Sequence, residues 1–163
     1  MNQSDHYGNT EVTCIVLYSF LENSSDVAFA SKLSSLKKQL LAPKQSYKAD
    51  EEIFRKIGAR LAVMGDKLAA EIEPSFVQNL AQQFRVENVP SQRIQHLSLA
   101  VQNVMARMPR ELEVEKAMLV AAMLLAKKVA NVVPEILQQV FNTTVNYIDQ
   151  NLHDYVNNLG PEN

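Results

Sequence analysis

The sequence predicts an all-α fold, an eight-helix bundle around a central hydrophobic helical hairpin. Apolar residues recur at spacings of three and four along most of the chain, and prolines separate these periodic segments. No run alternates apolar and polar residues between turn dipeptides, as a strand would. With 47% hydrophobic and 21% charged residues, the composition is that of a globular protein, so we expect residues 1–163 to form a single domain.

Eight segments carry the helical pattern, and several of their boundaries have a local cause. Ser25 and Asp50 are expected to cap the second and third helices, because their side-chain oxygens accept hydrogen bonds from the first N–H groups. Pro134 suits the first position of the seventh helix. Residues 42–50 form a short connection rather than a domain boundary. The expected helices are residues 12–22, 26–41, 51–72, 75–87, 91–107, 110–131, 134–150 and 152–159.

The central hairpin is expected over residues 110–150. Residues 117–126 are apolar on every side, as in a helix surrounded by neighbours, and Lys127 and Lys128 near its end complement the helix dipole. The next helix has one apolar stripe and one polar face, and a short turn makes the two helices antiparallel. The apolar run would span about 15 Å, half of a bilayer core, so we expect no membrane span.

The third helix, residues 51–72, carries one continuous apolar stripe with intervals of four, four, three, four and four residues. Such a stripe must be buried, as in any amphipathic core helix. Gly58 and Gly65 lie inside this helix, and each lowers the stability of the helix by about 1 kcal/mol relative to alanine. Because they lack a side chain, they allow another helix to approach closely. Asp66 follows Gly65 directly. The stripe consists of Ile53, Ile57, Leu61, Met64, Leu68 and Ile72.

Charge and cysteine content narrow the class of function. Sixteen Lys and Arg against eighteen Asp and Glu leave a formal charge of -2, which disfavours nucleic-acid binding. Cys14 is the only cysteine, so no intrachain disulfide is expected and the cytoplasm, a reducing compartment, is the expected location. A polar start and a polar tail after Leu152 predict neither a signal peptide nor a C-terminal anchor, and therefore a soluble protein.

Motifs for catalysis and metal binding are lacking. The sequence contains no convincing glycine-rich phosphate loop, histidine pair at metal spacing, nucleophile elbow or paired catalytic carboxylates. His6, His96 and His153 lie in distant segments, so solvated or capping roles are favoured over metal binding. We therefore expect no enzyme, no cofactor and no metal site.

Three strings resemble the Bcl-2 family of cell-death regulators. IGARLAVMGD, residues 57–66, resembles the third homology motif, or death motif, whose apolar residues fill pockets in a partner's groove. KAMLVAAMLLAKKVA, residues 116–130, and VFNTTVNYIDQNLHDYV, residues 140–156, resemble the family's central hairpin and last helix. With ENSSDVAFASKL near the start, the similarity covers nearly the whole chain. The chain is identified as a death agonist of the Bcl-2 family.

The resemblance implies that the third helix docks into a groove of partner proteins in apoptosis. The implied partners are anti-apoptotic Bcl-2 family proteins and the executioners Bax and Bak, which permeabilise the mitochondrial outer membrane. Gly65 would allow close approach, and Asp66 would pair with an arginine at the rim of the groove. The implied pocket anchors are Ile53, Ile57, Leu61, Met64 and Leu68.

The resemblance also implies that the central hairpin contacts anionic mitochondrial lipid after activation. Two lysines between polar flanks fit a helix that lies in the interface better than one that spans the membrane. The implied membrane-hairpin residues are Met118, Leu119, Met123, Leu124, Leu125, Lys127 and Lys128.

The resemblance also implies activation by a protease that cuts the loop before the death-motif helix. The cut would free this helix from an inhibitory N-terminal segment, which in this chain is residues 1–50. The loop in this chain is short, APKQSYKAD, and Asp50 is its only aspartate. Glu51 follows it in place of a glycine, so myristoylation at that site is excluded. Asp50 is therefore a candidate for a helix cap, for an activating protease, or for both.

Two other functions within the same family compete with a death agonist. A groove-bearing survival protein usually carries an Asn-Trp-Gly-Arg motif, and this chain has no tryptophan. A directly membrane-active protein would use the hairpin itself. The death motif favours the agonist.

Overall fold

The computed structural model describes residues 3–24, 31–35, 48–107, 113–152 and 155, with the side chains of 3–12, 48–52 and 71 excluded. Every regular element in these residues is a helix, which confirms the predicted all-α class. Residues 31–35 are helical as well. The named elements are α1 (Gln3–Asn23), α3 (Lys48–Leu68), η1 (Ala69–Glu71), α4 (Pro74–Val86), α5 (Pro90–Met105), α6 (Val114–Val132), η2 (Pro134–Ile136) and α7 (Leu137–Asn151).

Prolines set the start of several elements. Pro74 and Pro90 begin α4 and α5, where the missing N–H has no partner to lose. Pro134 begins the 3-10 turn η2, and α7 follows from Leu137. The prediction that Pro134 opens the α-helix itself was therefore wrong by three residues.

The starts of α1 and α3 also differ from the prediction. Helix α1 begins at Gln3 rather than at residue 12, because a helix held by packing extends through a polar segment at little further cost. Helix α3 begins at Lys48, so Asp50 lies in its first turn rather than at its cap. Ser25 lies outside the described residues, as do most of the expected eighth helix and residues 110–112 of the expected sixth.

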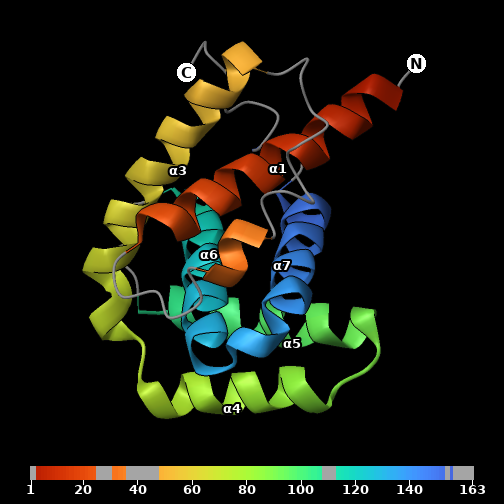
Figure 1. The fold of residues 1–163 in the computed structure, drawn as a ribbon. Coiled ribbons are helices and arrows are strands. Elements are labelled where there is room, and N and C mark those ends of the chain that lie inside the picture. Colours follow the sequence, from red (N-terminus) through yellow and green to blue (C-terminus); the bar gives the residue numbers. More distant parts are fainter. Residues whose placement is uncertain (1–2, 25–30, 36–47, 108–112, 153–154, 156–163) are drawn as a thin grey trace.

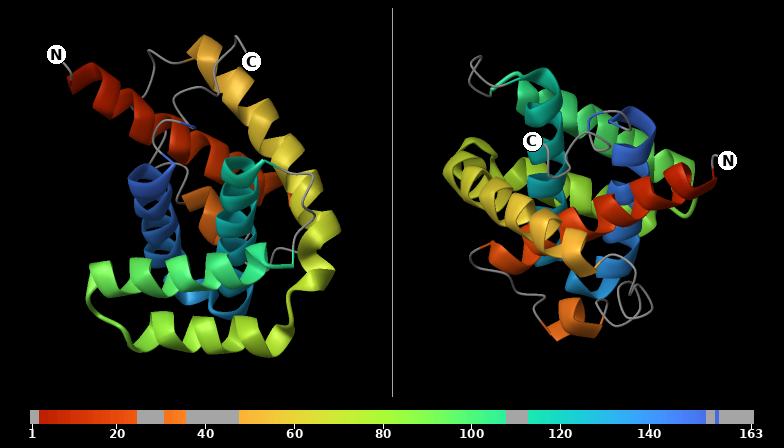
Figure 2. Two further views of the ribbon diagram at one scale, coloured as in Figure 1. Left: turned by 180° about the vertical axis from the view of Figure 1, so that it is seen from behind. Right: turned by 90° about the horizontal axis from the view of Figure 1, so that it is seen from above.

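Helix α6 is the centre of the bundle, as predicted. It contacts α1, α3, α4, α5 and α7. Figure 1 shows α6 and α7 side by side with α1 crossing them, while α4 and α5 close one end. The two further views in Figure 2 show α1 running alongside the first half of α3.

The arrangement explains why α6 is apolar on every side. Residues 119–127 are all buried, since neighbouring helices surround this stretch. Helix α7 buries only one face, which includes Val140, Phe141 and Ile148, and it exposes Asn142 and Asn146. Among the described residues, no helix is both long and apolar enough to cross a membrane.

We predict that Leu124→Ala lowers the free energy of unfolding by about 2–5 kcal/mol, through lost burial and the cavity left behind. Leu124 is 0% exposed in α6, whereas Leu99 in α5 is 62% exposed and provides a matched control. Leu99→Ala should change the free energy by about 0.5 kcal/mol or less. Equilibrium unfolding in urea measures both, and equal losses would contradict the central position of α6.

Candidate functional site

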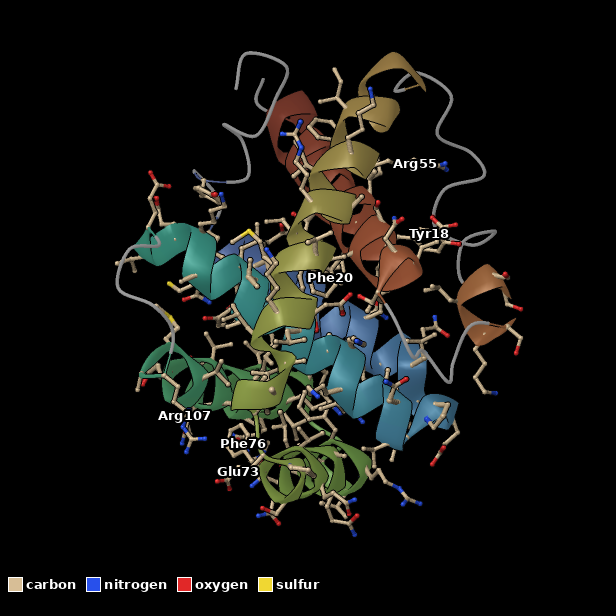
Figure 3. All side chains as sticks on the ribbon, turned by 90° about the vertical axis from the view of Figure 1, so that its left-hand side faces the viewer. Tyr18, Phe20, Arg55, Glu73, Phe76 and Arg107 are labelled. Atoms are coloured by element: carbon tan, nitrogen blue, oxygen red, sulfur yellow. The ribbon has the colours of Figure 1, made fainter. Side chains whose placement is uncertain are left out.

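The expected anchor stripe of α3 lies partly inside the bundle. Leu61 is buried in the core, while Ile57, Met64 and Leu68 are half-buried and pack at its edge. Ile53 is also half-buried. In Figure 3, α3 is in front and α1 lies behind it. The structure therefore brings these residues to one side of one helix, with Leu61 the most deeply covered.

The face of α3 that is most buried is not the anchor stripe. It is formed by Phe54, Gly58, Leu61, Ala62 and Gly65. At 100° per residue, this face is turned by roughly a quarter turn from the stripe, and Leu61 belongs to both. Phe54 was not expected at the site, although its position one turn before Gly58 indicates the same face.

Two glycines let α3 approach α1 closely. A Cβ added at Gly58 would lie 2.6 Å from the Ser19 Cβ and 2.6 Å from the Val16 carbonyl oxygen. A Cβ added at Gly65 would lie 2.7 Å from Cζ of Phe20, which Figure 3 labels behind α3. The close approach expected of these glycines is thus used within the molecule, against α1.

Polar contacts add to the hold of α1 on its neighbours. Ser19 donates a hydrogen bond of 2.6 Å from its Oγ to the carbonyl oxygen of Arg55 in α3. Thr13 donates one of 2.9 Å from Oγ1 to Oδ1 of Asp149 in α7. These α1 residues were not predicted as site residues, and the only signal for them is the nearly continuous apolar run around them.

Asp66 forms an ion pair inside the molecule. Its Oδ1 lies 3.3 Å from Nζ of Lys127 in α6. The Lys127 side chain is 7% exposed and that of Asp66 is 35% exposed, so the pair is buried at its lysine end. Asp66 of the expected death motif and Lys127 of the expected membrane hairpin, predicted separately, therefore meet in the folded chain.

The two lysines do not have the positions expected of them. Helix α6 continues to Val132, so its last turn contains neither lysine, and the prediction that they complement its dipole was wrong. Lys127 points into the bundle instead. Burial, and then the neighbouring charge of Lys127, lowers the pKa of Lys128.

The other expected membrane-hairpin residues are in the core. Met118 is half-buried, and the rest of the set is fully or almost fully buried. Contact with lipid would therefore require α6 to leave its place. The buried members are Leu119, Met123, Leu124 and Leu125.

Comparison with known families decides the relationship. Residues 44–162 match the family model described as BH3 interacting domain (BID). The chain belongs to the BID family. The match includes α3 and every described element that follows it, whereas α1 precedes it.

Two relatives of the BID family carry the name BH3-interacting domain death agonist. The protein of Gallus gallus is 40% identical over 185 positions, which cover 95% of this chain and 93% of the chicken protein. The protein of Mus musculus is 44% identical over 112 positions, which cover 68% of this chain and 57% of the mouse protein. The chicken alignment is longer than the 163 residues of this chain, so parts of that relative lie opposite gaps.

Of the expected connection, residues 42–50, only Lys48, Ala49 and Asp50 are described, and they belong to α3. Cleavage at Asp50 remains a prediction, and residues 42–47 lie outside the described part of the chain. Within that part, no three His, Cys, Asp or Glu side chains are grouped so that they could hold a metal ion.

We predict that Gly58→Ala destabilises this BID-family chain by about 1–3 kcal/mol, because the new methyl group meets α1 backbone that cannot rotate away. A matched small change on the exposed side of the same helix is Val63→Ala, which should cost about 0.5 kcal/mol or less; Val63 is 55% exposed. Thermal unfolding followed by circular dichroism compares them. A stabilised Gly58→Ala variant would contradict the close packing of α3 on α1.

Proposed function

We propose that this chain is a pro-apoptotic protein whose helix α3 binds the groove of Bcl-2 family proteins once it is released from the bundle. Membership of the BID family supports this proposal, and so does the position of the death motif on a helix whose anchors lie along one side. The observation that carries it is that Leu61, the middle anchor, is buried in the resting chain. Binding by α3 then requires a change of state.

The energy of docking would come from the anchors. Each apolar side chain that moves from water into a pocket contributes roughly 1.5–3 kcal/mol. Half-buried anchors such as Ile57 and Met64 gain less than this from the resting fold, so a groove offers them more burial than the bundle does. Because Leu61 must first leave the core, the apparent affinity falls with the fraction of molecules in which α3 is free.

The segment that covers α3 is α1, so residues 1–50 are the proposed inhibitory segment. An activating protease that cuts after Asp50 would separate the two parts. Asp50 lies in the first turn of α3, where a helix end opens at low cost, and such opening would give the protease access. The contacts of Ser19 and Phe20 with α3 would hold the helix only until the N-terminal part dissociates.

The released α3 is proposed to engage anti-apoptotic proteins and to activate Bax and Bak at the mitochondrial outer membrane. The intact chain would reside in the cytoplasm. After release, the apolar side chains of α6 are proposed to lie on anionic mitochondrial lipid, with Lys127 and Lys128 at the headgroups. In this proposal the chain acts by binding, without catalysis or a cofactor.

We predict that Met64→Glu weakens binding of the chain, cut at a protease site introduced after Asp50, to an anti-apoptotic Bcl-2 protein by about 10- to 100-fold. A charged carboxylate cannot replace an apolar anchor in a pocket without a large desolvation cost. Titration calorimetry or a pull-down measures the loss.

Met64 is preferable to two more obvious positions. Leu61→Glu places a charge in the core, and Gly65→Glu strikes the Phe20 ring, so either change disturbs the resting fold as well as the anchor face. Val63→Glu is the matched control, since Val63 is exposed and lies outside the anchor stripe. Equal binding by the Met64 and Val63 variants would contradict docking through the anchor stripe.

A further inference from the structure

Lys127 is the one Lys, Arg, His, Asp or Glu side chain that is buried among the residues whose side chains the structure describes. It belongs to α6, and the residues around it on that helix, including Leu124, Ala126 and Ala130, are apolar and buried. Its ion pair is with Asp66, on α3. The charge inside the central helix is therefore balanced by a residue of the helix that is proposed to leave.

Neither partner can be removed without an effect on the other. An ammonium group in a low-dielectric interior is tolerated when an anion or hydrogen bonds compensate it, and it is strongly destabilising when the partner is lost. Asp66 lies at the more exposed end of the pair, so it can move into water. The Lys127 side chain is only 7% exposed, so Asp66 is its nearby counter-charge while α3 is in place.

We propose that the Asp66–Lys127 ion pair couples the withdrawal of α3 to the loosening of α6. When α3 leaves, Lys127 is left uncompensated, and α6 turns or separates so that the ammonium reaches water or an anionic surface. The inference rests on the proposed function, because it takes the release of α3 as the event that breaks the pair. The coupling is reciprocal: whatever displaces α6 also weakens the hold on α3.

The pair also gives α3 an attachment that does not depend on α1. The contacts at Gly58 and Gly65 hold α3 to α1. Asp66 holds α3 to α6, and it lies beside the buried face of α3, on the side away from the anchor stripe. A partner that captures the anchors must therefore also break a contact with α6. In this way partner binding, rather than cleavage by itself, starts the rearrangement of the central helix.

The first test uses the intact chain without any partner, by hydrogen exchange of the α6 amides. Asp66→Asn should accelerate exchange in α6 by about tenfold or more, because it strands Lys127. Lys127→Met replaces the charge with an apolar side chain of similar length and should leave α6 protected. The double variant should resemble Lys127→Met alone, since no charge remains to be compensated.

Lys128→Met is the matched control for the loss of a lysine. Lys128 is adjacent and only half-buried, so its removal should not protect α6 when combined with Asp66→Asn. Rapid exchange in the Asp66→Asn/Lys128→Met chain, with slow exchange in Asp66→Asn/Lys127→Met, supports the coupling. Equal exchange in the two double variants would overturn it, and a far-ultraviolet circular dichroism spectrum of each variant checks that the helices remain.

The second test adds an anti-apoptotic Bcl-2 protein to the chain cut at the introduced site. Binding should accelerate α6 exchange in the unsubstituted chain and have little effect on α6 in Lys127→Met, although both bind. If both bind and α6 opens equally in each, the coupling is wrong and the proposed function stands. If neither binds, the proposed function is wrong, and the partner-free comparison still decides whether the ion pair holds α6.

Discussion

The close packing of α3 on α1 is the contact on which the resting state depends. Two glycines about two turns apart on the same face bring the backbone of α3 against Val16, Ser19 and Phe20, at distances that a Cβ would not permit. This approach places Leu61 in the core and leaves the other anchors at its edge. The same helix is thus held by one face, while a second face, which carries the proposed anchors, is only partly buried.

Hydrophobic periodicity predicted the helices and the central position of α6, because a helix that is apolar on all sides must be surrounded. It also predicted the stripe from Ile53 to Leu68. It did not predict the buried face, because Gly58, Ala62 and Gly65 carry little or no apolar side chain and add nothing to a periodic signal. Small residues show where another helix can come close, but not which helix it is.

The ion pair could not be predicted from the sequence for a different reason. Asp66 and Lys127 are 61 residues apart, on helices whose relative rotation is fixed by packing alone. Lys127 was expected near the end of its helix as a partner of the helix dipole, whereas it lies before the last turn of α6 and is buried. A charged residue next to an apolar run usually indicates the end of a buried helix segment. Only the position of the neighbouring helix α3 shows that this lysine is paired with Asp66.

Some residues of α3, such as Leu61, therefore contribute both to the stability of the resting fold and to the proposed activity. A domain of this size has a net stability of only about 5–15 kcal/mol, so loss of the α1 contacts is enough to shift the balance toward a free helix. The most direct measurement is dye release from cardiolipin-containing liposomes bearing Bax, with the intact chain compared to one cut at a site introduced after Asp50. Release that rises on cutting is predicted; equal release by both chains would contradict the inhibitory role of α1.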